Sequence, residues 1–316
     1  METQKPIHEL SVGDEIGGFY MLQSATVKTD KNGNPYLNAT VTDATGSIGA
    51  KRWSYVPEEP FQDGCVVYLR GKVSEFGGTN QLTLTHIRPA TEKDHVELAA
   101  LVPSAPIDAD AAMDYVRRTV ASITDTDYRA VCEEMLSRHG DDFFQIPAAK
   151  SVHHAFLHGL LMHTANMLRS ADGLSDIYAE VVDRNLLLSG TLLHDFAKCR
   201  EFALSRCRMV TDYTAEGHLL GHLYMAAREV DEICRTLNVP AEKAMLLQHM
   251  LLSHHGEPEF GAAVRPACAE AELLSYIDLI DSRLEIYAET YSNMSPGDLS
   301  GKIFALDRRI YFPKTE

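Results

Sequence analysis

The first ninety residues alternate apolar and polar side chains with the two-residue period of half-buried β-strands. Leu37, Ala39 and Val41 show this alternation most clearly, and turns rich in Gly, Asn, Asp and Pro precede and follow them. The other expected strands lie at 14–28, 47–53, 65–76 and 81–88, and the last hairpin turn is expected at Gly77-Gly78. Five short antiparallel strands of this size favour a small closed barrel such as the OB-fold.

From about residue 92 onward, the apolar positions change to the spacing of helices. Asp108 or Asp110 is expected to cap the first helix, which follows a proline-containing linker at 99–106. Apolar residues then recur at helical spacing from His153 to Tyr291. Breaks between these helices are expected at 171–173, 238–240 and 256–266.

These patterns divide the chain into three parts. We predict a multidomain α and β protein that has an OB-fold β-barrel over 1–95, a helical connector over 96–150 and an all-α domain over 151–316. With 316 residues, of which 45% are hydrophobic, the chain is long enough to fill two separate cores.

Composition narrows the class of protein further. No stretch approaches the roughly 18 apolar residues of a membrane span, the first residues do not resemble a signal peptide, and the six cysteines form no CxxC pair. We therefore expect a cytoplasmic protein with reduced thiols and no membrane partner. The net charge of −16, from 29 basic and 45 acidic residues, argues against an extended basic surface for phosphate binding.

A histidine-aspartate pair within an apolar run is the main chemical signal of the chain. Neighbouring residues of a helix point about 100° apart, so His194 and Asp195 face one point only at a helix end or bend. An imidazole and a carboxylate that converge there suit a divalent metal ion, and an apolar segment would otherwise exclude both groups.

Further candidate ligands lie on separate expected helices: His163, His222, His254, His255 and Asp278. Seven ligands exceed what one octahedral ion needs, so we expect two ions bridged by a carboxylate and a hydroxide. The mixture of imidazole and carboxylate favours divalent transition metals, with Mn²⁺ first and Fe, Co, Ni or Zn as alternatives. The sequence leaves open the roles of His153, His154, His158, His218, His249 and Asp281.

This ligand pattern resembles the HD superfamily of metal-dependent phosphohydrolases. The resemblance rests on His163, His194-Asp195 and Asp278, and the other histidines look like the second-metal ligands of its binuclear members. It implies that Asp195 bridges the ions. It also implies that each ion has three further ligands, which are His163, His194 and Asp278 for the first and His222, His254 and His255 for the second.

Of the positions that follow the His-Asp pair, one agrees with that superfamily and one dipeptide departs from it. Lys198 lies where many HD proteins have a lysine that neutralises phosphate, so the resemblance implies a catalytic role for it beside Asp195. Phe196-Ala197 replaces a common Ile-Gly, which is a change of size that leaves the ligands intact.

The two predicted domains together resemble the YhaM family of 3′-5′ exoribonucleases over nearly the whole chain. The matching segments are 33–37, 43–48, Trp53, 153–164, 192–195, 216–222, 252–256 and 276–283. The resemblance implies hydrolysis of single-stranded RNA from its 3′ end to 5′-mononucleotides, with a metal-bridged hydroxide as the nucleophile. Single-stranded DNA is a second candidate substrate.

The barrel would then hold the substrate strand. OB-folds stack bases on aromatic side chains and contact phosphates with basic ones. The candidate stacking residues are Tyr36, Trp53 and Phe76, and the candidate phosphate contacts are Lys51, Arg52 and Lys72. Alternatively, the aromatic residues only pack within the protein and Lys51 is an ordinary solvated strand residue.

Two other functions stay open at this point. An HD phosphodiesterase or phosphohydrolase could act on a small nucleotide or a cyclic dinucleotide, because one fold serves several reactions. A non-enzymatic adaptor could bind single strands through the barrel and use the helical domain only as a scaffold. A homo-oligomer is compatible with either reading.

Overall fold

The computed structural model describes residues 4–58, 60–62, 64–76, 79–96, 101–102, 104–149, 156–205, 208–292 and 294–314. The chain divides into two compact units, which are treated separately below. The first consists of Met1–Ser104 with Ala203–Asp212, and the second of Ala105–Phe202 with Tyr213–Glu316. Of the connector expected over 96–150, residues 105–149 therefore belong to the second unit, and the three-part division stays a proposal.

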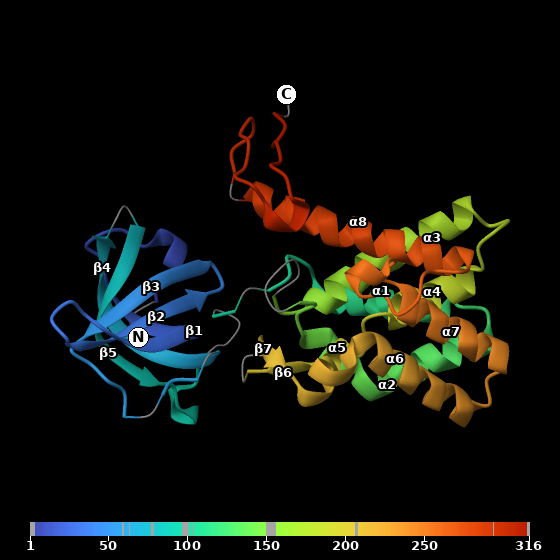
Figure 1. The fold of residues 1–316 in the computed structure, drawn as a ribbon, viewed down its shortest axis with the longest axis horizontal. Helices are drawn as coiled ribbons and strands as arrows, with labels where there is room; N and C mark the ends of the chain where they lie inside the picture. Colours follow the sequence, from blue (N-terminus) through green and yellow to red (C-terminus); the bar gives the residue numbers. More distant parts are fainter. Residues whose placement is uncertain are drawn as a thin grey trace. The chain divides into compact units, whose positions relative to one another are not determined.

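The first unit is built around a closed five-stranded barrel (Figure 1), which confirms the predicted fold class. Its strands are β1 (Glu15–Thr29), β2 (Pro35–Asp43), β3 (Gly46–Trp53), β4 (Cys65–Phe76) and β5 (Thr79–Pro89), with short 3₁₀ helices η1 (Ile7–Glu9) and η2 (Glu92–Asp94). The strand order is β1-β2-β3-β5-β4. The expected turn at Gly77-Gly78 lies outside the described residues.

The barrel closes through a parallel pair of strands. Residues 49–51 of β3 pair in parallel with residues 81–83 of β5, whereas the other four neighbouring pairs are antiparallel. The expectation of a wholly antiparallel barrel is therefore wrong at this closing pair. β3 and β5 run the same way because β4 lies between them in the sequence and reverses the chain once more.

The first strand is long enough to pair with two neighbours in succession. β1 pairs with β4 from Glu15 to Leu22 and with β2 from Met21 to Thr29, and its register shifts between Leu22 and Ser24. Such a bulge bends a strand and increases its twist. The inward residues form the apolar core of the barrel, which includes Tyr20, Leu22, Leu37, Val41, Leu69 and Leu82.

The second unit is helical. Its helices are α1 (Ala109–Ala121), α2 (Thr126–Gln145), α3 (Gly159–Ile177), α4 (Arg184–Leu193), α5 (Lys198–Glu201), α6 (Ala215–Leu237), α7 (Ala241–Ser253) and α8 (Ala269–Ser292). The strands β6 (Phe202–Leu204) and β7 (Val210–Tyr213) pair with each other and lie between α5 and α6 in the sequence, and their residues 203–212 belong to the first unit. In the second unit, η4 (Pro258–Phe260) lies before α8. α4 is the centre of the bundle, because it packs against α2, α3, α7 and α8.

The helix boundaries agree with an expected cap and with two of the three expected breaks. Asp108 caps α1 by accepting from the Ala111 N–H at 3.0 Å, as predicted. The breaks at 238–240 and 256–266 are present, but α3 runs through 171–173 to Ile177. That expected break is wrong because Ala171 and Ser175 are buried in the bundle, which offsets the roughly 1 kcal/mol cost of an exposed glycine in a helix.

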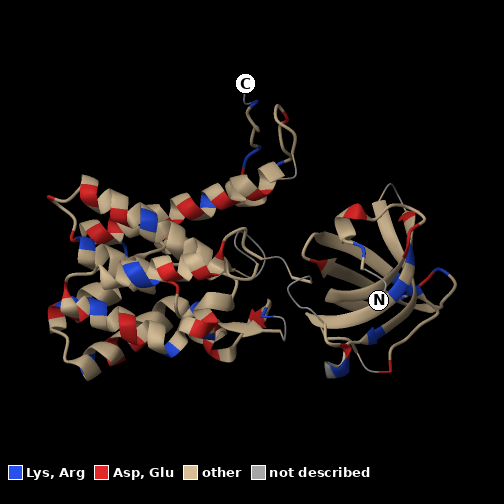
Figure 2. Ribbon diagram, turned by 180° about the vertical axis from the view of Figure 1, so that it is seen from behind, with Lys and Arg blue, Asp and Glu red and all other residues tan. Residues whose placement is uncertain are grey.

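Beyond α8, residues 294–314 form a hairpin-like arm (red in Figure 1) that includes η5 (Phe304–Leu306). Ile286 of α8 packs with Leu306 and Ile310 of the arm in a small apolar cluster. Acidic and basic residues are interspersed over the helices (Figure 2). In the described part of the chain, no helix is long and apolar enough to cross a membrane, and the described cysteines are free.

Candidate functional site

His194 and Asp195 lie where α4 ends. The helix ends at Leu193, His194 is its capping residue, and Asp195 lies in the turn that leads to α5. A helix end is what this adjacent pair requires if both side chains are to face one point. His194 is 0% exposed and Asp195 is 3% exposed, and they directly follow helical residues 186–193, which are all buried. Burial of two polar groups in such a segment costs free energy unless their atoms find partners.

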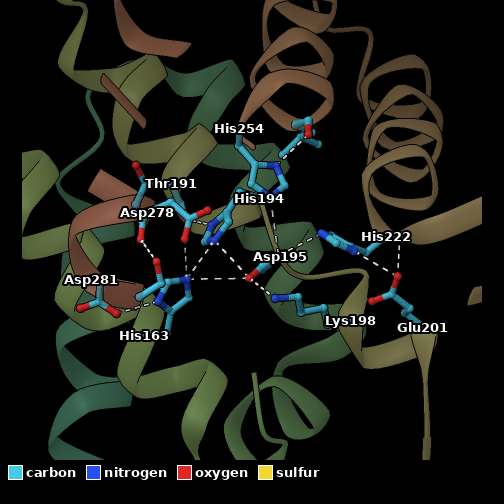
Figure 3. Close-up of polar contacts among 12 residues, drawn as sticks. His163, Thr191, His194, Asp195, Lys198, Glu201, His222, His254, Asp278 and Asp281 are labelled. Atoms are coloured by element: carbon cyan, nitrogen blue, oxygen red, sulfur yellow. Dashed lines mark hydrogen bonds and ion pairs between the residues drawn. The ribbon is translucent and has the colours of Figure 1, made fainter. Parts of the chain in front are cut away.

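Asp195 lies between two groups of ligand atoms (Figure 3). Its Oδ2 is 3.3 Å from His194 Nε2 and 3.8 Å from His163 Nε2. Its Oδ1 is 3.5 Å from His222 Nε2 and 3.8 Å from His254 Nε2. Within each group the ligand atoms lie within 4.8 Å of one another, and the groups are His163, His194 and Asp278, and His222, His254 and His255. The structure thus brings together all seven residues that the sequence singled out.

Two of these imidazoles are held by main-chain carbonyl groups. His194 Nδ1 donates to the carbonyl of Thr191 at 2.7 Å, and His254 Nδ1 donates to the carbonyl of Leu251 at 2.8 Å. A carbonyl oxygen only accepts, so Nδ1 carries the hydrogen in both rings. Each Nε2 is therefore left as the atom that faces Asp195.

Two other imidazoles are held by carboxylates. His163 Nδ1 lies 2.7 Å from Asp281 Oδ2, and His222 Nδ1 lies 3.1 Å from Glu201 Oε1. A carboxylate on the far nitrogen of a ligating histidine fixes its tautomer and its ring orientation. The sequence left the role of Asp281 open and did not single out Glu201. The three-residue spacing of Asp195, Lys198 and Glu201 was the available signal, since it places them along one side of a helical turn.

Two glycines allow His222 to reach this position. Gly221 has φ 70° and ψ 156° inside α6, so the helix is kinked immediately before His222. A positive φ of this kind favours glycine. At Gly217, an added Cβ would collide with the main-chain oxygen of Glu201, so only glycine allows the start of α6 to approach the end of α5 so closely.

Lys198 lies beside the central carboxylate. Its Nζ is 2.7 Å from Asp195 Oδ2, and its side chain is mostly buried. Burial opposes the charged form of each partner, but Asp195 raises the pKa of Lys198, and Lys198 with His194 holds the pKa of Asp195 well below its usual value. The pair is therefore an ammonium and a carboxylate.

His163 differs in its protonation from His254 and His255. Burial, together with neighbouring histidines, lowers the pKa of His254 and of His255, so both are neutral, which is the form that binds metals. Burial also opposes the charge on His163, but Asp278 and Asp281 raise its pKa to about 10. A cation at Nε2 of His163 would compete with that proton.

Unsatisfied polar atoms test whether metal ions fit the cluster. Asp195 Oδ1, His222 Nε2, His254 Nε2 and His255 Nδ1 are buried and have no hydrogen-bond partner among the described residues. Buried polar atoms without partners are rare in proteins and costly in free energy. Nitrogen and oxygen atoms that converge in this way are the donor set of divalent transition metals, so the residues fit such ions.

A small cavity adjoins the cluster. Its volume is about 140 Å³, and it is lined by Ala148, His163, Asp195, Lys198, His255, Asp278 and Ser282. Pockets that enclose a whole small ligand usually measure about 300 to 1,000 Å³. The cavity is therefore of a size for a phosphate group rather than for a complete nucleotide. A larger open hollow, on the C-terminal arm, contains no histidine or cysteine.

The other histidines in question lie outside the two groups of ligand atoms. His158 Nδ1 donates to the Phe144 carbonyl at 2.6 Å at the start of α3. His249 Nε2 accepts from the Ala267 N–H at 2.9 Å and so holds the loop before α8. The ring of His218 lies 5.4 Å from that of Tyr213. His153 and His154 lie outside the described residues.

The candidate strand-binding residues of the barrel lie together on its outer surface. The rings of Tyr36 and Trp53 are 4.7 Å apart across β2 and β3. Lys51 Nζ lies 5.8 Å from the ring centre of Trp53 and 5.1 Å from that of Phe76. Trp53 is 47% exposed and Phe76 is 72% exposed, so neither is part of the barrel core. We call these four residues the aromatic patch.

The two remaining phosphate-contact candidates are placed differently. The guanidinium of Arg52 lies 3.8 Å from the ring centre of Tyr55, next to the aromatic patch in sequence. Lys72 is exposed on β4, where it pairs across the sheet with Glu15 and Thr83. No contact joins Lys72 to the aromatic patch among the described residues.

The comparison with known proteins first identifies the class of domain to which the helical unit belongs. Residues 160–283 match the HD domain family, and this segment contains all seven clustered residues. An HD domain implies dependence on divalent metal ions, in agreement with the two groups of ligand atoms. The helical unit is thus an HD hydrolase domain.

Full-length relatives define the family. The chain is 33% identical to the 3′-5′ exoribonuclease YhaM of Bacillus licheniformis over 308 residues, which are 97% of this chain and 96% of that protein. It is 32% identical to the YhaM protein of Listeria innocua over 314 residues, 99% of each chain. The chain therefore belongs to the YhaM family of 3′-5′ exoribonucleases.

Solved structures similar to the chain include OB-fold domains. The second OB-fold domain of replication protein A from Methanococcus maripaludis is 17% identical, with a TM-score of 0.24, and the match covers 30% of this chain and 100% of that one. An OB domain from Thermoplasma acidophilum is 15% identical, also with a TM-score of 0.24, covering 33% of this chain and 92% of that one.

Proposed function

We propose that the seven clustered residues bind two divalent ions. Asp195 would hold both ions through its carboxylate, and the three residues of each group would hold one of them. The first group is His163, His194 and Asp278, and the second is His222, His254 and His255. The position of Asp195 supports this assignment most directly, because each of its two oxygens faces the Nε2 atoms of a different group.

The residues around the ions hold and complement the reacting groups. When bound, the ions supply positive charge at the scissile phosphate and lower the pKa of the attacking water. Lys198 lines the cavity and places a second positive charge beside Asp195, where it stabilises charge on the phosphate oxygens. Mn²⁺ is the ion we propose, because a mixed imidazole and carboxylate set suits it better than Mg²⁺.

The activity is that of a metal-dependent 3′-5′ exoribonuclease, which shortens single-stranded RNA and releases 5′-mononucleotides. The polarity rests on membership of the YhaM family, whose members carry that activity in their names. The aromatic patch supports a single-stranded substrate, because exposed rings beside a lysine are suited to stacked bases and a phosphate. Single-stranded DNA has the same faces and phosphates and is the second substrate to test.

Hydrolysis of a free small nucleotide is the alternative. The cavity at the ligands holds about 140 Å³, which leaves a base outside it. A substrate that inserts only its phosphodiester into the site fits this size better than a nucleotide that must be enclosed. We further propose a cytoplasmic location, which rests on the composition and on the free thiols of the described cysteines.

A labelled RNA ladder separates these activities. Full-length protein with Mn²⁺ should shorten a 5′-labelled single-stranded RNA one nucleotide at a time from its 3′ end. A circular RNA of the same sequence is the matched control and should stay intact. Equal cleavage of the circle would indicate an endonuclease, and faster hydrolysis of cyclic dinucleotides than of RNA would favour the alternative function.

A further inference from the structure

A buried glutamate at the metal centre has no part in the function proposed so far. Glu201 is the last residue of α5 and is 5% exposed. Its carboxylate lies beside the second group of ligand atoms (Figure 3).

Both hydrogen bonds to this carboxylate come from one residue. Glu201 Oε1 accepts from His222 Nδ1 at 3.1 Å and from the main-chain N–H of His222 at 2.9 Å. The first bond fixes the ring, and the second fixes the backbone. Because Gly221 interrupts the helix immediately before His222, regular helix geometry does not determine where this imidazole points. Glu201 supplies that constraint.

This constraint determines which nitrogen atom of His222 faces the centre. With hydrogen on Nδ1, the Nε2 of His222 is the atom left to face the centre, 3.5 Å from Asp195 Oδ1. That Nε2 is buried and has no hydrogen-bond partner in the described ranges of the chain. An imidazole free to rotate could turn this atom away from the centre. Glu201 prevents that rotation.

We propose that Glu201 is the positioning residue of the second metal group, setting the affinity of the ion held by His222, His254 and His255. It acts through His222 and does not bind the metal itself. The inference rests on the two-ion site of the proposed function. Orienting partners of this kind typically change metal affinity about 10- to 100-fold.

The first group contains a matched control. Asp281 holds His163 through its Nδ1 at 2.7 Å, as Glu201 holds His222. The two carboxylates lie on different helices, α8 and α5, and each contacts a histidine of a different group. Removal of either one should therefore weaken a different ion.

The test measures Mn²⁺ binding to metal-free full-length protein by equilibrium dialysis. Wild type should bind two ions, and Glu201→Ala should weaken one of them about 10- to 100-fold and leave the other unchanged. In a His222→Ala background, Glu201→Ala should change the affinity of the remaining ion less than about twofold, because the imidazole through which Glu201 acts is absent. Asp281→Ala in that background should still weaken the remaining ion.

A conservative variant separates position from charge. Glu201→Gln keeps an oxygen that accepts both hydrogen bonds, so its Mn²⁺ affinity should stay within about threefold of that of the wild type. This variant also provides the test if Glu201→Ala does not fold. An equal loss in Gln and Ala variants would overturn a positioning role, as would an effect of Glu201→Ala that persists without His222. Unchanged binding of both ions in Glu201→Ala would also overturn it, whereas a wild type that binds fewer than two ions would overturn the two-ion site itself.

Discussion

The barrel and the helical unit present their candidate functional residues in opposite ways. The aromatic patch lies on the outer face of the barrel, where Trp53 and Phe76 contact solvent and Lys51. In the helical unit, by contrast, the candidate ligands lie inside the bundle, and four of the imidazoles are each fixed by a carbonyl or carboxylate. Stacking tolerates variation in position, whereas bonds to a metal ion do not.

Buried carboxylates of the two units also differ in the groups that they bind. In the barrel, Asp43 accepts from main-chain N–H groups, which are those of Thr45 and Gly46 in its own turn and that of Ile7, 36 residues away. In the helical unit, Glu229 contacts His139 and Arg200 from two other helices. Side chains of the helical unit therefore depend on side chains of other helices, whereas Asp43 binds main-chain groups, so changes in the helical unit should have larger effects than changes on the barrel.

Replacement of the central carboxylate should have the largest effect. Asp195→Ala removes a proposed ligand from both ions at once, so the rate of RNA hydrolysis should fall at least about 10³-fold. The ladder assay measures the rate, and circular dichroism shows whether the bundle is retained. Asp176→Ala, an exposed acid on α3, is the control and should stay at the wild-type rate. Near-normal turnover by Asp195→Ala would refute its bridging position.

Changes to the aromatic patch should weaken strand binding and spare bond cleavage. Trp53→Ala and Phe76→Ala should each cost roughly 1–3 kcal/mol of RNA-binding free energy, because each removes a stacking surface. Fluorescence anisotropy in an Asp195→Ala background measures binding without degradation. Tyr68→Ala is the aromatic control, since Arg88 and Phe19 already pack on that ring. A loss as large in the control would show that the patch has no special role.

The internal charge network should affect stability rather than RNA binding. Glu229→Gln should lower the free energy of unfolding by roughly 1–3 kcal/mol at pH 7, because buried partners lose a charged acceptor. Burial would raise the pKa of Glu229, but His139 and Arg200 hold it below its usual 4.5. A lowered folded-state pKa stabilises the protein above about pH 4.5, and this contribution is lost as pH falls through the folded-state value.

Urea unfolding at pH 7 and at pH 4 checks this dependence. The difference between wild type and Glu229→Gln should shrink at the lower pH. A difference that grows as the pH falls would contradict the assigned sign of the shift.

Removal of a helix cap should have the smallest of these effects. Asp108→Ala deletes the acceptor of the Ala111 N–H at the start of α1, and should cost about 1 kcal/mol of unfolding free energy. Asp110→Ala, an acid in the same first turn that does not serve as the cap, should cost only a few tenths of a kcal/mol. Equal losses would show that charge, and not the capping hydrogen bond, stabilises this helix end.

Local patterns were sufficient to predict much of the fold and the ligand cluster. Strand alternation around Leu37 and the cap at Asp108 depend on neighbouring residues, so the sequence alone reveals them. His194 and Asp195 stand out because polar side chains are unusual in an apolar helix. The five other clustered residues were predicted from their order along the chain and from the family resemblance.

Features that depend on distant partners were not predictable in this way. Gly173 resembles a helix break until the burial of Ala171 and Ser175 within the bundle is known. For Glu201, the three-residue spacing from Asp195 and Lys198 places it near the pair but does not reveal its acceptor role, which depends on His222, 21 residues away and beyond a kink. The parallel pairing of β3 with β5 likewise follows from barrel closure and has no local signal.

That parallel pair has a consequence for how the barrel assembles during synthesis. β2 and β3 are joined by a two-residue turn, so the hairpin that carries Tyr36 and Trp53 needs only nearby residues to form. Closure requires residues 81–83 to meet residues 49–51, and long-range pairing of this kind is slow because a large loop must be ordered first. On the ribosome, the hairpin of Tyr36 and Trp53 can therefore exist before the barrel that supports it, and β5, the last of the five strands to emerge, closes the barrel.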